Sequence, residues 1–286
     1  MASFGHQTYT IGNRTVYLKW IKTNHKDIRI VNPGGKNVYD YAVTNNLYGI
    51  NGTFYYTEMD SCPDGYQAYN VHKIAAYNSD PGNSNIASVR NHGLINRGPA
   101  GFMFCQYHLS AEIPYIVYSD VLNGSLASYS TYTLDMKNIR WAIGGVSLHL
   151  DMNFSTADSY YNYINTNEPL WANWTRSAPR SAIFYIGGSS VGENIVLLSV
   201  FSENKSYSAD NPTSTMNSSS TGVTPYQLRT LIKDVFPNAT THGIMLDGGS
   251  SAGIAYKNTS GTVGAYVASS GLSVPSPANT MIVTPM

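Results

Sequence analysis

The sequence predicts an α+β fold in which β-strands dominate. Most apolar runs are short and rich in Tyr, Val, Ile and Thr, and turn-forming Gly, Asn and Pro residues separate these runs. The clearest helical pattern is confined to one segment. The 286 residues include 42% hydrophobic residues, which is ample for a buried core. We therefore expect one domain over residues 1–286, with a β-dominated mixed sheet and a few packed helices.

The expected strands are bounded by turn-forming residues, and Tyr-rich strands with polar partners are typical of a half-buried sheet. They cover residues 7–11, 15–20, 27–31, 47–56, 71–77, 115–118, 139–150, 182–185 and 194–201. Gly144 and Gly145 interrupt one run, which indicates a bulge or a close approach of another backbone.

The clearest helix begins after Thr224, because a capping residue, Pro225 at the first helical position and Gln227 together form a capping-box pattern. Apolar residues then recur at helical spacing, and Pro237 ends the helix. Before this helix, residues 202–222 form a polar stretch that is typical of a mobile surface loop.

The charge composition excludes several classes of partner. Only 12% of residues are charged and the formal net charge is zero, so neither a nucleic acid polymer nor an anionic membrane is an expected partner. An anionic small molecule would have to be bound by a few local groups.

A short apolar run at residues 243–246 ends in Asp247-Gly248-Gly249-Ser250-Ser251. A strand with this ending places a carboxylate at its end, and the two glycines let backbone N–H groups converge on an anion. The alternative is a tight turn in which Asp247 accepts local amides, because Asp-Gly is a frequent turn dipeptide.

Three motifs occur in order along the chain: Gly-Ile-Asn-Gly-Thr-Phe-Tyr at 49–55, Pro-Arg-Ser-Ala-Ile at 179–183, and Ile-Met-Leu-Asp-Gly-Gly-Ser-Ser at 244–251. Together they resemble the phosphodiester glycosidase family, which includes enzymes acting on N-acetylglucosamine 1-phosphodiesters and bacterial and phage relatives. The resemblance spans roughly residues 45 to 260. It departs from the family pattern at Thr53 and Ser181, which stand where the family has glycine and threonine, and in having two glycines after Asp247 where the family often has three.

The resemblance implies a single phosphodiester-glycosidase-like domain that cleaves the sugar C1–O bond of a glycosyl phosphodiester, giving free sugar and a phosphomonoester. Asp247, Arg180 and Asn51 are then the expected catalytic residues. The expected substrate-binding residues are Gly52, Gly248, Gly249, Ser250 and Ser251.

Each catalytic residue has a chemical role in this hypothesis. Arg180 binds phosphate through its planar fork, and its alternative is a structural salt bridge. Asp247 acts as nucleophile, as general base or as the electrostatic partner of an oxocarbenium-like transition state. Asn51 bonds a sugar hydroxyl or a phosphate oxygen, and its alternative is a satisfied core asparagine. Gly248, Gly249 and Ser250 donate N–H groups to phosphate, with a hydroxyl from Ser250 or Ser251.

A second carboxylate is needed if the usual acid pair operates, and Glu58, Asp60 and Asp151 are the candidates by position. The histidines lack metal-ligand spacing, so no cofactor is expected, although Ca²⁺ or Mg²⁺ at Asp247 is compatible with carboxylate and phosphate ligands. Two other function classes remain open: a non-catalytic glycan-binding module of a phage or surface particle, and an intracellular hydrolase of a nucleotide-derived messenger.

The first residues, Met1 to Gln7, contain no basic region followed by an apolar run, which predicts no signal peptide. We expect a cytoplasmic or virion-associated protein, with a secreted form whose signal was removed as the alternative. Cys62 and Cys105 fit either one disulfide or two thiols. The sequence does not predict an oligomeric state.

Overall fold

The computed structural model describes residues 2–31, 33–52, 55–56, 69–70, 100–108, 111–119, 139–167, 175–187, 192–217, 222–239, 243–258, 260–269, 275–278 and 280–286. These residues form an α+β structure dominated by two β-sheets, as the sequence predicts. Sheet A has eight strands, all paired antiparallel, and sheet B has six strands with one parallel pair.

In spatial order, sheet A contains β1 (Ser3–Ile11), β2 (Arg14–Thr23), β11 (Ile195–Phe201), β10 (Arg180–Tyr185), β13 (Gly243–Met245), β9 (Ile139–Ser147), β7 (Ala100–His108) and β8 (Ala111–Ser119). Sheet B contains β12 (Met216–Asn217), β15 (Val263–Ser269), β14 (Gly253–Lys257), β4 (Leu47–Asn51), β16 (Met281–Pro285) and β3 (Arg29–Val31). A separate pair joins β5 (Tyr55–Tyr56) to β6 (Tyr69–Asn70).

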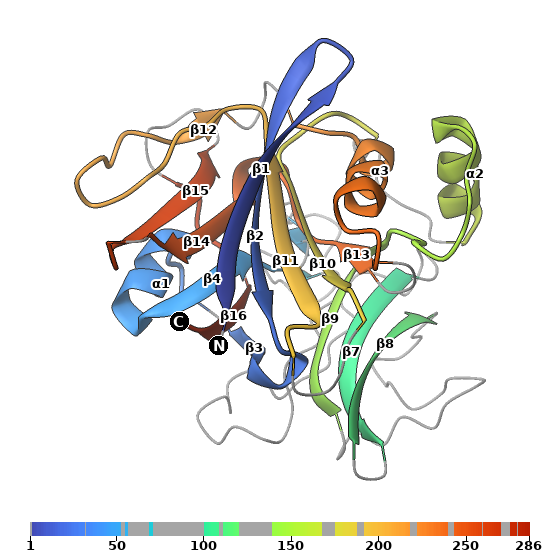
Figure 1. Ribbon diagram of the computed structural model, residues 1–286, viewed down its shortest axis with the longest axis horizontal. Helices are drawn as coiled ribbons and strands as arrows, with labels where there is room; N and C mark the ends of the chain where they lie inside the picture. The colour runs from blue at the N-terminus through green and yellow to red at the C-terminus, as the bar shows by residue number, and fades with distance from the viewer. Residues whose placement is uncertain are drawn as a thin grey trace.

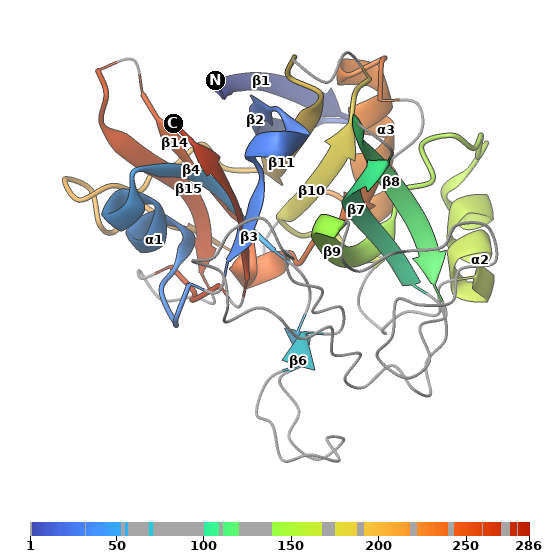
Figure 2. The same ribbon diagram turned by 90° about the horizontal axis from the view of Figure 1, so that it is seen from below.

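The two sheets pack face to face, and helices cover their outer faces (Figures 1 and 2). Helix α1 (Val38–Asn45) packs on sheet B, whereas α2 (Ala157–Asn167) and α3 (Pro225–Val235) pack on sheet A. Between the sheets, Ile183 and Leu197 of sheet A meet Ile50 and Ile254 of sheet B in one buried apolar cluster. The layers therefore run helix, sheet, sheet, helix.

Alternation along the strands explains this layering, because successive side chains of a strand point to opposite faces. In β10, Ile183 belongs to the cluster between the sheets, while its neighbours Ala182 and Phe184 belong to the cluster under α2 and α3. Both faces of sheet A are thus buried at β10 and β11, and this accounts for the nearly continuous apolar sequence of β11.

The predicted helix is confirmed as α3. Thr224 and Gln227 form a complete capping box, Pro225 stands at the first helical position, and the helix ends at Val235. Its buried residues include Leu228, Leu231 and Ile232, which lie on sheet A.

Several predicted strands differ in their limits. The expected strand at 27–31 starts only at Arg29, because His25–Asp27 form a 3-10 turn capped by Asn24. The expected strand at 47–56 ends at Asn51, and Tyr55–Tyr56 pair in a different sheet. The expected strand at 71–77 lies outside the described residues.

The close backbone approach predicted at the Gly144-Gly145 pair is confirmed at Gly145. A Cβ on Gly145 would lie 2.3 Å from the backbone oxygen of Met245 on the neighbouring strand β13. The absence of a side chain there lets β9 run close beside β13, the strand that leads into the Asp247 turn.

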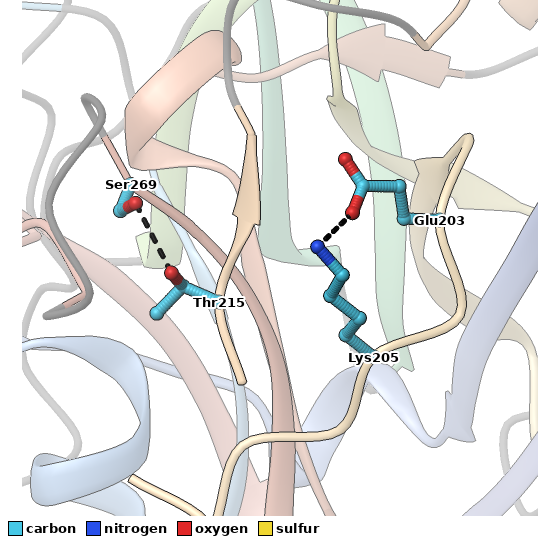
Figure 3. A network of polar contacts seen from close by, with 4 residues as sticks. All are labelled: Glu203, Lys205, Thr215 and Ser269. Carbon is cyan, nitrogen blue, oxygen red and sulfur yellow. Dashed lines mark hydrogen bonds and ion pairs between the residues drawn. The ribbon is translucent and has the colours of Figure 1, made fainter. Parts of the chain in front are cut away.

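The polar segment at 202–222 is the expected mobile surface loop, and over residues 202–217 the structure pairs it with sheet B. Tyr207 and Ala265 exchange backbone hydrogen bonds of 2.6 and 2.8 Å, and Met216, 1% exposed, pairs with β15 and enters the core. The Thr215 and Ser269 hydroxyls lie 3.2 Å apart, and Glu203 forms an ion pair with Lys205 (Figure 3). One buried methionine and backbone pairing attach this polar sequence to sheet B.

Candidate functional site

The Asp247 turn carries the chain from sheet A to sheet B. It starts after β13, continues through a 3-10 turn at Gly249–Ser251, and enters β14 at Gly253. Gly249 has φ of +61°, a left-handed conformation that favours glycine. Asp247, Gly248, Gly249 and Ser250 are partly exposed, so the turn reaches the surface at the junction of the two sheets.

The Asp247 carboxyl group is surrounded by polar neighbours but loses much of its hydration. Its Oδ1 accepts the backbone N–H of Gly248 at 2.8 Å, and the Ser251 side chain also hydrogen-bonds to it. Burial raises the pKa of Asp247 to about 6, and the bonds from Ser251 and Gly248 and the positive charge of Arg180 only partly oppose this rise. Asp247 is therefore mostly ionised at pH 7 and titrates just below neutrality.

Arg180, the first residue of β10, lies next to the Gly248 part of the turn. A Cβ on Gly248 would lie 2.7 Å from the Pro179 backbone oxygen and 3.3 Å from both Cδ and Nη1 of Arg180, so the missing side chain lets the turn pack closely on both residues. Arg180 is 5% exposed, its Nε donates to the Val223 carbonyl at 3.3 Å and its Nη2 to the Arg176 carbonyl at 2.7 Å. These bonds fix the plane of the guanidinium.

Burial lowers the pKa of Arg180 to about 10, and the negative charge of Asp247 opposes this shift. The guanidinium is still a cation at neutral pH. The two groups attract each other, and each keeps its charge at pH 7 in spite of desolvation. A carboxylate and a buried guanidinium thus interact electrostatically at one partly exposed turn.

Asn51, the last residue of β4, lies behind the turn and not at its surface. It is 1% exposed, its Nδ2 donates to the backbone oxygen of Asp247 at 2.8 Å, and its Oδ1 accepts from Ser181 and from the backbone N–H of Gly253. The side chain is therefore a satisfied core asparagine, which is the alternative that the sequence left open beside contact with substrate. Its effect on chemistry must therefore pass through the position of Asp247.

The expected anion nest differs from the observed turn. The Gly248 N–H bonds to Asp247 and the Gly249 N–H donates to the Pro179 carbonyl at 2.9 Å, so both amides are used within the protein. The compact 3-10 turn brings these donors inward. Ser250 is partly exposed, and the Ser251 side chain hydrogen-bonds to Asp247.

Gly52 joins the two halves of the site. Its N–H donates to the Thr280 carbonyl at 2.7 Å, and its carbonyl accepts the N–H of Asp247 at 3.0 Å. A Cβ on Gly52 would lie 2.2 Å from Oγ1 of Thr280 and 3.0 Å from its backbone carbon. The glycine thus serves close packing of the backbone and leaves no side chain beneath Asp247.

Gly52→Ala is expected to lower the free energy of unfolding by about 1–3 kcal/mol, because the new methyl group forces β4 away from residue 280. Urea unfolding measures this loss. Gly12→Ala is the matched control, since Gly12 has φ of +60° but nothing lies within 4 Å of the added atom, so only conformational strain of about 1 kcal/mol is expected. Equal stability of Gly52→Ala and wild type would contradict the packing described.

The second acid is not among the groups that act on Asp247 within the described ranges. Asp151 is exposed, and its charge acts on Arg229 and Lys233. Glu58, Asp60, Cys62 and the side chain of Cys105 lie outside what the structure describes. In the described part of the chain, no three His, Cys, Asp or Glu residues gather as a metal site would require.

Two tyrosines near Arg180 were missed by sequence reasoning. Tyr160 and Tyr161 on α2 act electrostatically on Arg180, and the Tyr160 hydroxyl donates to the Ser147 carbonyl at 3.1 Å. The only available signal was the repeated tyrosine in residues 157–167, whose polar sequence has too weak an apolar stripe to predict a helix.

Comparison with known proteins gives a likeness of fold alone. No family model matches the chain, and no curated protein matches it. A solved structure of a hypothetical protein from Synechocystis is similar, with a TM-score of 0.50, 10% identity, and coverage of 99% of this chain and 62% of that chain. This chain thus spans less than two thirds of that protein.

A second solved structure, named "Putative exported protein" and from Burkholderia pseudomallei, has a TM-score of 0.48 and 9% identity, over 96% of this chain and 75% of its own. Among the described helices, none has the length and apolar character needed to cross a membrane.

Proposed function

We propose that the protein hydrolyses the C1–O bond of a glycosyl phosphodiester, with Asp247 and Arg180 as its catalytic residues. The observation that carries the proposal is the meeting of a carboxyl group with a pKa of about 6 and a buried guanidinium at one partly exposed turn. Perturbed acids beside a fixed opposite charge are concentrated at functional sites. The three motifs that supply the turn, Arg180 and Asn51 resemble those of phosphodiester glycosidases.

Arg180 binds the phosphate in this proposal. Departure of a phosphate monoester from the sugar leaves negative charge on its oxygens, and a rigid guanidinium stabilises that charge with parallel N–H bonds. Its contacts with Val223 and Arg176 hold the fork in place before the substrate binds. Because phosphate is already a weak base, the reaction depends less on a strong general acid than ordinary glycoside hydrolysis does.

Asp247 supplies the negative charge on the sugar side. As an ionised carboxylate it serves as nucleophile, as base toward water, or as electrostatic partner of the developing oxocarbenium ion, and all three roles need the deprotonated form. In this proposal Ser250 adds a hydroxyl or an amide to the bound phosphate, and Gly52 and Gly248 keep side chains out of the site. Asn51 holds the turn in place.

The pH profile of kcat/KM should be bell-shaped. Activity rises about tenfold per pH unit below pH 6, as Asp247 loses its proton, and declines again near pH 10, where Arg180 deprotonates. Initial rates between pH 4.5 and 10.5 measure both limbs. A rate that falls from pH 5 to pH 7 would assign the protonated acid to the reaction and contradict this role for Asp247.

A substrate panel tests the proposal. Hexose and N-acetylhexosamine 1-phosphodiesters, nucleoside-diphosphate sugars and cyclic ADP-ribose are incubated with wild type and Asp247→Asn, and the products are identified by mass spectrometry. Free sugar with a phosphomonoester from wild type alone is the expected result. Binding of a glycan without turnover, unchanged in Asp247→Asn, would instead favour a glycan-binding module.

A further inference from the structure

A chain of buried hydroxyl groups crosses from sheet A to the back of the Asp247 turn. We propose that Ser181 and Ser199 are positioning residues, which orient the Asn51 amide and through it hold Asp247 and the Gly253 end of the turn. Their effect on catalysis rests on the function proposed above, whereas their effect on the turn does not.

Ser181 and Ser199 are directly paired neighbours on β10 and β11, so their side chains share the face of sheet A that points to sheet B. Both are fully buried, and their hydroxyl oxygens lie 3.0 Å apart. The Ser181 hydroxyl donates to Oδ1 of Asn51 at 2.5 Å. Because a hydroxyl has one proton, Ser199 must be the donor to Ser181.

The chain therefore has one direction, from Ser199 through Ser181 and Asn51 to the carbonyl of Asp247. Oδ1 of Asn51 accepts two bonds, from Ser181 in sheet A and from the Gly253 N–H in sheet B at 3.0 Å. These two donors force the amide nitrogen to point the other way, toward Asp247 at 2.8 Å. The same amide is thereby connected to the residues at both ends of the turn.

The hydrogen bond to Asn51 explains why position 181 carries a hydroxyl, which apolar packing alone does not explain. Position 181 points into the apolar cluster between the sheets, where an unneeded hydroxyl would cost free energy. This network fixes the backbone of Asp247. The Asp247 N–H donates to the carbonyl of Gly52, and the Asp247 carbonyl accepts from Asn51, so both backbone groups are held by the end of β4. The carboxyl group is left to bond with Gly248 and Ser251 and to interact electrostatically with Arg180.

The test compares Ser181→Ala with Ser181→Thr. Ser181→Ala removes the hydroxyl and a single oxygen's volume, whereas Ser181→Thr keeps the donor. Thr23→Val is the matched control, because the Thr23 hydroxyl is also buried and bonds to Thr284 at 2.7 Å, away from this chain. Two measurements are made: amide hydrogen exchange over residues 246–253, and kcat and KM separately.

We expect Ser181→Ala to speed exchange at the Asp247 and Gly253 amides by about tenfold, since local opening exposes both. Its kcat should fall about tenfold with KM nearly unchanged, because a displaced reacting group affects the chemical step. Ser181→Thr should restore both values to within about threefold of wild type, the added methyl group being the remaining perturbation.

Exchange over residues 246–253 in Ser181→Ala that equals that of Thr23→Val would overturn the proposal, as would failure of Ser181→Thr to restore protection. If wild type turns over none of the phosphodiesters, the proposed activity fails, but the exchange comparison still decides whether Ser181 positions the turn.

Discussion

Asp247→Asn is expected to abolish activity while making the protein more stable at pH 7. Loss of the carboxylate should lower kcat by about a thousandfold or more, since the nucleophile, the base and the charge partner are all the same group. The free energy of unfolding of Asp247→Asn should increase, because burial of the Asp247 charge destabilises the wild-type protein. The pKa of Asp247 is raised from 3.8 to about 6, so folding favours its protonated form.

The stability gain should depend on pH. A raised pKa means that the native state binds the proton more tightly than the unfolded chain, so this group stabilises the fold below about pH 4 and that contribution is lost as pH rises through 6. At pH 7 ionisation of Asp247 costs about 1–3 kcal/mol. Asparagine avoids this cost at every pH, because it has the same shape and no charge.

Thermal unfolding at pH 4 and pH 7 measures the effect. The Tm of Asp247→Asn minus the Tm of wild type should be larger at pH 7 than at pH 4, and Asp247→Asn should be inactive at both pH values. Asp210→Asn neutralises an exposed carboxylate and provides the control, with no comparable pH-dependent gain expected. A variant that loses stability at pH 7, or keeps wild-type turnover, would contradict the role of Asp247.

Arg180→Lys is expected to lower kcat/KM by about a hundredfold, because a lysine keeps the charge but cannot form the planar, two-pronged contact with phosphate. The loss should be larger for substrates whose phosphate is a poorer leaving group, since these depend most on charge stabilisation. A series of phosphodiesters with aglycones of different acidity measures this dependence, as the slope of log kcat/KM plotted against the pKa of the leaving group.

Arg229→Lys is the matched control for burial. Arg229 is 4% exposed and donates to the carbonyl groups of Leu148 at 2.9 Å, His149 at 3.2 Å and Met152, so it holds a loop on the same face of sheet A. Its replacement should lower Tm without changing the leaving-group slope. If Arg180→Lys likewise loses Tm but leaves the slope unchanged, Arg180 is structural and does not bind phosphate.

The sequence predicted those parts of the fold whose signals are local. The capping box at Thr224, the helical apolar stripe after it and the glycine at which β9 approaches β13 closely follow from short-range chemistry. The first two helices were missed because α1 and α2 have polar, Tyr- and Asn-rich sequences, and tertiary packing on the sheets stabilises them. Strands β14 and β16 both pair with β4, which is far away in sequence, and no local pattern specifies these pairings.

The site shows the same division. The motifs place Asp247, Arg180 and Asn51 in one expected site. They leave open whether Asn51 contacts substrate or is a satisfied core asparagine, since this depends on how β4 and β10 pack across two sheets. The glycines suggested an anion nest, whereas their amides are taken by Asp247 itself and by Pro179. Only the full hydrogen-bond geometry distinguishes a donor that faces a ligand from one that faces the protein.

Hydrolysis in water enriched with ¹⁸O tests the central claim most directly, because it identifies the bond that is cleaved. Free sugars exchange their C1 oxygen with water, so the phosphomonoester is the product to analyse. Cleavage of the C1–O bond leaves the phosphate without ¹⁸O, which is the result predicted here for wild type. One ¹⁸O atom in the phosphomonoester would show cleavage of the P–O bond and contradict a glycosidase acting through Asp247.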